Sequence, residues 1–275
     1  MKIKYFIEAV KTDPDIIKCS VTLKGIRASI EPMVKKLTDT DEEYTTLMEI
    51  IPKFYRDHYH KDYEEMQCHT YEYTEYLYDE DDEPLYDEDG NQQTKRSVDV
   101  YTSRGQAGTG RTKMPLDEDS DYVHKYPGIL LGIHNHPNNS SSFQSSGDWI
   151  NQAKFLVKFG VSCGDDGIDI TKMNARDYDT VDGFSFDFHK TVWGYERNRE
   201  KAIWAAGDTN GANQIQKDYE EGKITPEEAD SKLHDVLHTH LKTHGDDERK
   251  TVNKIFKDKG YEMEVYHIDI PKAYA

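Results

Sequence analysis

Cysteine, basic charge and long apolar runs are all scarce in this chain of 275 residues. The three cysteines, Cys19, Cys68 and Cys163, are isolated and odd in number, which argues against a disulfide framework and favours small buried thiols in a reducing compartment. Lys and Arg number 35 against 53 Asp and Glu, so the formal net charge is −18. That charge would repel a phosphate backbone, and we therefore expect no nucleic-acid partner.

The sequence also lacks a segment suited to a membrane. Its longest apolar run, residues 128–133, is far shorter than the roughly 20 residues of a membrane-spanning helix. The N-terminal stretch carries an acid at Glu8 and no unbroken apolar run, unlike a signal peptide. We expect a soluble, cytoplasmic protein with no membrane partner. Its oligomeric state is left open.

The middle of the chain indicates a layered fold. Residues 126–137 contain an apolar run that stops at Pro137, which is typical of a buried strand. An Asn- and Ser-rich loop, a well-buried helix over about 146–159 and a hairpin around Asp166-Gly167 follow. This order predicts an α/β or α+β layer structure.

Composition divides the chain into a mixed, largely helical extension, a core and a charged helical region with a closing strand, over residues 1–67, 68–190 and 191–275. In the first part a helix begins at Asp41, and Pro52 should bend or divide it. In the last part Thr225 begins a capping box for a helix to about residue 245, and a second helix stops at Gly260.

Residues 71–78 are short and rich in aromatic side chains, so they predict a strand. The acidic stretch that follows, residues 79–90, predicts a solvated hairpin tip that turns at Asp89-Gly90. It does not fit an EF-hand, because counting back from Gly90 places Leu85 at the first ligand position.

The strongest chemical pattern is His134-Asn135-His136-Pro137, with Ser145 and Asp148 downstream. In an extended segment the side chains at i and i+2 point the same way, so both imidazoles reach one point beyond the strand. Asp148 would add a carboxylate from the first turn of the next helix. Two histidines, one carboxylate and an open position are typical of a catalytic zinc site.

These residues resemble the HxHP…SxxD pattern of the JAMM (MPN+) zinc metallopeptidases and deubiquitinases. The asparagine between the histidines is similar to bacterial branches, including RadC-like proteins and the domains of phage and mobile-element proteins. The resemblance covers about residues 70–172, and the spacing from His136 to Ser145 is one residue longer than usual. It implies a cytidine-deaminase-like mixed sheet packed with helices, Zn²⁺ as cofactor, and Ser145 as a hydroxyl beside the metal.

The resemblance further implies a glutamate on an earlier strand as general base for the metal-bound water. Glu72 and Glu75 are the candidates. They lie three residues apart and so on opposite faces of one strand, which means that only one can point at the metal. We favour Glu72, because it leaves a full strand before the turn at Asp79.

Two further patterns offer different chemistry. Residues 105–112 follow P-loop spacing with arginine in place of lysine, but no helix is indicated after them, which argues against a nucleotide binder. Residues 234–238, HDVLH, mimic HExxH on a helix, although His240 and His244 nearby indicate a generally His-rich surface.

The leading hypothesis is a zinc-dependent hydrolase of peptide or isopeptide bonds, acting on a peptide or ubiquitin-like protein substrate. The alternative is a non-catalytic binding or structural module of a phage or mobile element that keeps the fold as a scaffold. A glutamate within reach of the metal-bound water distinguishes the two hypotheses.

Overall fold

The computed structural model describes residues 22–105, 115, 128–137, 140–174, 185–206 and 211–271. Its strands are β1 (Glu65–Thr70), β2 (Tyr73–Tyr76), β3 (Thr94–Ser97), β4 (Val100–Arg104), β5 (Ile129–Asn135), β6 (Phe159–Gly164), β7 (Gly167–Met173) and β8 (Met263–Ile268). Its helices are α3 (Leu23–Leu37), α4 (Asp41–His58), α6 (Ser146–Lys154), α8 (Ser185–Ala206), α9 (Ala212–Glu220) and α10 (Pro226–Lys259).

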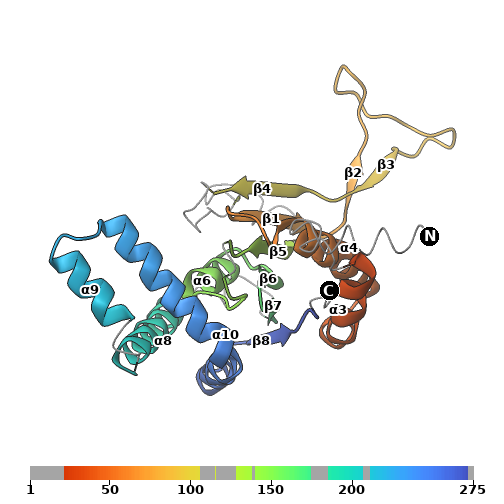
Figure 1. Ribbon diagram of the computed structural model, residues 1–275. Coiled ribbons are helices and arrows are strands. Elements are labelled where there is room, and N and C mark those ends of the chain that lie inside the picture. Colours follow the sequence, from red (N-terminus) through yellow and green to blue (C-terminus); the bar gives the residue numbers. More distant parts are fainter. Residues whose placement is uncertain are drawn as a thin grey trace, which may run out of the picture.

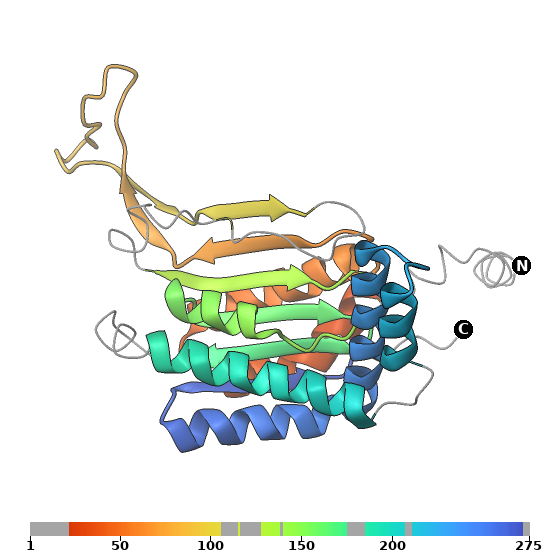
Figure 2. The same ribbon diagram turned by 90° about the vertical axis from the view of Figure 1, so that its left-hand side faces the viewer.

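A mixed sheet in the order β4-β1-β5-β6-β7-β8 forms the centre of the fold (Figure 2). Strands β5 and β6 are parallel, whereas the other paired neighbours in this sheet are antiparallel. A parallel pair needs a crossover connection, and the segment that contains α6 provides it. The predicted α/β class, a mixed sheet packed with helices, is confirmed.

Helices cover both faces of the sheet (Figures 1 and 2). Helices α3 and α4 pack on one face, with Ile26, Ile30 and Val34 buried at four-residue spacing. Their apolar side chains share one core cluster with residues of β5, β6, β7 and β8. Helices α3 and α4 are therefore part of the same core as the sheet. Pro52 lies inside α4 and does not divide the helix.

The opposite face is covered by α6, α8 and part of α10, around Trp149, Phe188 and Phe256. The capping box at Thr225 and the left-handed Gly260 are confirmed as the ends of α10. One helix of 34 residues nevertheless replaces the two that we predicted. Figure 2 shows that α10 changes direction along its length: its first part crosses one end of the sheet and its second part lies along the face.

Strand β1 differs most from the sequence-based expectation, which placed residues 65–67 in the N-terminal extension. Its sequence, EMQCHT, is polar, but it lies between β4 and β5 and is half-buried or buried throughout. The pairing compensates its charge, because Glu65 accepts two hydrogen bonds from the Arg104 guanidinium on β4, at 2.8 and 3.2 Å. Burial of a charged side chain is tolerated when it is paired in this way.

The aromatic segment 71–78 forms only the short strand β2, which pairs with β3 in a separate hairpin that projects from the sheet (Figures 1 and 2). The acidic tip is exposed, and Gly90 has φ of 82°, as a turn at Asp89-Gly90 requires. Helix α6 ends at Lys154, earlier than predicted, because Leu156 adopts a left-handed φ of 51° before β6 begins.

Two compositional expectations can be compared with the structure. Cys68 and Cys163 are free and buried, as expected, whereas Cys19 lies outside the described residues. No helix in the described part of the chain is both long and apolar enough to cross a membrane.

A buried ionic network joins α10 to the sheet. The Asp169 carboxylate on β7 accepts hydrogen bonds from Arg249 Nε at 2.9 and 3.0 Å, from Ser142 Oγ at 3.1 Å and from His267 Nδ1 at 2.6 Å. Burial raises the pKa of Asp169, but these partners outweigh it and lower the pKa below its ordinary value. Burial lowers the pKa of His267, but the bond to Asp169 outweighs that effect and raises it.

We expect Asp169→Asn to lower the free energy of unfolding by about 3–5 kcal/mol, because it removes the fully buried carboxylate that pairs with Arg249 and leaves this buried charge only the exposed Asp246 and the more distant Asp166 at 3.9 Å. Because folding lowers the pKa of Asp169, this group stabilises the fold at pH values above its unfolded pKa of ~3.9. Because folding raises the pKa of His267, that group stabilises the fold at pH values below its unfolded pKa of ~6.5. The loss of stability in the variant should therefore be largest between these two pH values. Urea unfolding across pH measures it. The matched change Asp247→Asn, in the exposed pair with Lys250, should leave stability unchanged; an equal loss in both variants would contradict the argument.

Candidate metal centre

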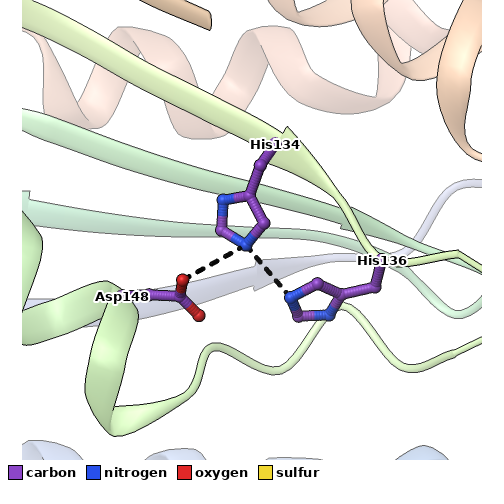
Figure 3. A group of neighbouring side chains, drawn as sticks. All are labelled: His134, His136 and Asp148. Atoms are coloured by element: carbon purple, nitrogen blue, oxygen red, sulfur yellow. Dashed lines mark hydrogen bonds and ion pairs between the residues drawn. The ribbon is translucent and has the colours of Figure 1, made fainter. Parts of the chain in front are cut away.

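Three predicted side chains converge at one end of the sheet (Figure 3). His134 Nε2 lies 3.0 Å from His136 Nε2 and 3.5 Å from Asp148 Oδ1. One ligand atom from each residue lies within 4.8 Å of the other two. Zinc-bound nitrogen and oxygen at ~2.0–2.1 Å in tetrahedral geometry would be roughly 3.3 Å apart, so these spacings suit a shared metal ion. The group can hold a metal ion.

The local structure explains this convergence. His134 is the second-last residue of a fully buried strand, β5, and His136 follows the strand with its N–H bonded to the Cys163 carbonyl of β6 at 2.8 Å. Asp148 lies in the first turn of α6, the helix that links the parallel strands. The carboxyl ends of parallel strands and the start of the connecting helix are where open α/β sheets bind ligands.

A capping box fixes Asp148. Ser145 Oγ accepts from the Asp148 N–H at 3.3 Å, and Asp148 Oδ2 accepts from Ser145 N–H at 2.7 Å and from Ser145 Oγ at 2.9 Å. Oδ2 is thereby occupied, and Oδ1 faces His134. The Ser145 hydroxyl therefore bonds to the Asp148 carboxylate and orients it.

A backbone carbonyl fixes the ring of His136. Its Nδ1 lies 2.5 Å from the Ser141 carbonyl oxygen, which can only accept, so Nδ1 carries the proton and donates. The Nε2 lone pair is then free to face His134 and a metal ion. Metal-binding histidines commonly have this second hydrogen bond, which sets both tautomer and ring orientation.

The electrostatics keep the donor groups in their metal-binding forms. Burial lowers the pKa of His134 to about 4, against the opposing effect of Asp148, so the imidazole is neutral near pH 7. Burial raises the pKa of Asp148, but the two histidines and the bonds from Ser145 outweigh it and lower the pKa. A neutral imidazole and an ionised carboxylate are the forms that bind metal.

Asn135, between the two histidines, has a function that the sequence pattern did not suggest. Its side chain points away from the metal centre, donates from Nδ2 to the Tyr63 carbonyl at 2.9 Å and accepts at Oδ1 from the Glu65 N–H at 2.8 Å. The amide thus continues the β1–β5 ladder past the end of β5. It fixes the backbone on both sides of Glu64.

Glu64 is the acidic residue that the structure adds to the site. It lines a cavity of about 40 Å³ together with the candidate metal ligands His134 and Asp148 and with Met66, Gly132, Gln144, Asn151, Gln152, Val157, Gly160 and Val161. Met66 pairs directly with His134, so the side chains of Glu64, two residues before Met66, and His134 share one face of the sheet. A water molecule needs ~10–15 Å³ by this measure, so the cavity has room for a water molecule.

The structure does not bring Glu72 or Glu75 to this site, and the general-base prediction is corrected accordingly. Thr70 pairs with Ile129, at the other end of β5 from His134, and Glu72 lies still further along. At ~3.3 Å per residue it is roughly 20 Å from the metal centre. Glu72 pairs with Arg96 at 2.8 Å and Glu75 with Lys95 at 3.0 Å, both on the projecting hairpin.

The other motifs have different outcomes. Residues 106–112 of the P-loop-like segment lie outside the described residues. In HDVLH, His238 Nδ1 accepts from the Ser141 N–H at 3.0 Å, so its proton is on Nε2, which donates to His234 Nε2 at 2.9 Å. That tautomer leaves His238 without a ring nitrogen for a metal ion, which argues against a second zinc site there.

The comparisons with known proteins give no relative. No protein-family model, no curated protein and no solved structure matches this chain.

Proposed function

We propose that this protein is a zinc-dependent hydrolase that cleaves peptide or isopeptide bonds, in the manner of the JAMM metallopeptidases that its HNHP…SxxD residues resemble. The observation that supports this proposal best is the convergence of His134, His136 and Asp148 beside a cavity that Glu64 also lines. Two imidazoles and one carboxylate are one of the donor sets found in catalytic zinc sites, which keep a further position open for water or substrate.

A zinc ion held there would act as a Lewis acid, lower the pKa of its bound water to ~7 and polarise the substrate carbonyl. Glu64 would accept the proton of the attacking water, and the same carboxyl would pass it to the leaving amine. Asp148 and His136 would hold their orientations through Ser145 and Ser141 during the reaction. Donation of a hydrogen bond from Ser145 to the oxyanion stays a prediction, since its hydroxyl faces Asp148.

The non-catalytic alternative would be favoured if no glutamate came near the metal centre. Glu72 and Glu75 do not, but Glu64 lines a cavity together with His134 and Asp148, and the pairing of β1 with β5 supports its position on the same face of the sheet as His134. The cavity therefore contains an acid suited to general-base catalysis as well as the metal ligands. This favours the hydrolase over the scaffold.

Hydrolysis of internally quenched peptides and of lysine isopeptide conjugates by the full chain tests the proposal. We expect cleavage with stoichiometric zinc, loss of activity on removal of the metal by a chelator, and recovery when zinc is restored. A protein that is free of metal after exposure to zinc, or that binds zinc and cleaves neither class of bond, would contradict it.

A further inference from the structure

The first part of α10 passes directly over the metal centre. In Figure 2 it crosses the carboxyl ends of β5 and β6. His134 and Cys163 are the second-last residues of these two strands. Two contacts secure it there: His238 accepts from the Ser141 N–H at 3.0 Å, and Lys242, one turn later, pairs with Asp165 at 3.1 Å. Helix α10 therefore contacts both the loop that contains Ser141, between His136 and Asp148, and the turn between β6 and β7.

The loop that α10 touches also orients a metal ligand. Ser141 is fully buried, and its carbonyl accepts the Nδ1–H of His136 at 2.5 Å while its N–H donates to His238. The His136 and His238 rings meet edge to face, with centroids 5.8 Å apart. Ser141 thus connects His238, 97 residues later in the chain, with the ring of His136.

The turn between β6 and β7 also holds Ser141 and its neighbour Ser142. Asp166 accepts from Ser141 Oγ at 2.7 Å and from the Ser142 N–H at 2.6 Å. The loop also lies on Gly164, where an added Cβ would come within 2.2 Å of the Ser142 nitrogen. The backbone of Ser141 is therefore clamped between the β6–β7 turn and α10, and His238 is the residue of α10 that bonds to it.

We propose that His238 is a positioning residue of the metal centre, which holds Ser141 so that the Ser141 carbonyl fixes the tautomer and orientation of His136. This inference rests on the proposed metal centre. It makes the C-terminal helix part of the active site, although HDVLH itself binds no metal in this arrangement. It also explains why His238 presents Nδ1 as an acceptor and donates from Nε2 to His234.

The test uses three variants of the full chain. His238→Phe keeps a ring against His136 but removes the acceptor, whereas His238→Asn places Oδ1 where Nδ1 was. His244→Phe is the matched control on the same helix, because His244 stacks on His240 and bonds to its carbonyl. Outer-shell changes cost 10–100-fold in metal affinity, and we expect about tenfold weaker Zn²⁺ and Co²⁺ binding for His238→Phe.

The Co²⁺ absorption spectrum reports ligand geometry and distinguishes positioning from general stability. We expect His238→Phe to change the spectrum, His238→Asn to restore both spectrum and affinity, and His244→Phe to change neither. Unchanged affinity and spectrum in His238→Phe would overturn this inference and leave the metal centre intact. A wild-type chain that binds neither ion would overturn both.

A measurement on the wild-type chain covers the case in which His238→Phe fails to fold. Nitrogen-15 NMR of the metal-free protein should show the His136 proton on Nδ1 and the His238 proton on Nε2. The opposite tautomer at either ring would overturn the inference.

Discussion

The double variant His134→Ala, His136→Ala is expected to lose its zinc and, with it, all hydrolytic activity. These rings supply two of the three protein ligands, and an aspartate alone, here Asp148, does not retain zinc at neutral pH. Altering only the outer partners of a ligand costs 10–100-fold in affinity, so removal of two ligands should cost more than ~100-fold. Metal content after dialysis and rate on the best substrate measure the effect.

A matched control removes two histidines elsewhere. His240 and His244 stack on each other on α10, with centroids 4.4 Å apart, and neither is in the triad. The variant His240→Ala, His244→Ala should keep stoichiometric zinc and full activity. Stoichiometric zinc in the first double variant would show that the metal lies elsewhere in the chain.

Much of the metal centre is encoded locally and could be predicted from the sequence. An apolar run that stops at a proline specifies the end of β5, and the alternation of an extended chain, continued one residue past the strand, predicts His134 and His136 on one side. The Ser145 and Asp148 pair specifies a helix start by the same hydrogen bonds that orient the ligand. Each of these features depends on residues close together in the chain.

The proposed general base, Glu64, could not be located in this way, because its position depends on the long-range pairing of strands. Strand β1 is mostly polar, with Met66 and Cys68 as its apolar residues, and its charge is compensated by Arg104, which lies 39 residues after Glu65. One signal was present. The residues Glu64, Met66 and Cys68 alternate, which is the pattern of a strand face that leads from an apolar interior to an acid.

We predicted that the strand with the general base is the aromatic segment 71–78, because this segment has high strand propensity. Propensity indicates that a segment is extended, but it does not say which neighbour the segment pairs with. Here the aromatic strand β2 pairs with β3 in the outer hairpin, and the polar strand before it takes the place beside β5. The role of α10 is equally hidden from the sequence, since nothing near His238 specifies contact with Ser141.

The Glu64→Gln variant is expected to keep its zinc and to lose 10²–10⁴-fold in hydrolysis rate, the typical contribution of a general base, about 3–5 kcal/mol of activation free energy. Glutamine keeps the shape of the side chain and can still bond to a water, but its amide cannot take up the proton. Because Glu64 is not one of the three ligands, metal content should stay stoichiometric. Rate and metal content are measured on the same preparation.

Two controls make this result specific to Glu64. Glu72→Gln alters an exposed pair with Arg96 at the far end of β5 and should leave the rate unchanged. Glu65→Gln changes the adjacent residue, whose carboxylate bonds to Arg104, so any effect should appear in stability before it appears in the rate of the folded protein. Full activity in Glu64→Gln would show that Glu64 is not the general base. Loss of activity in Glu72→Gln would contradict the pairing of β1 with β5. In that pairing Glu64 lies near His134, whereas Glu72 lies beyond the opposite end of β5.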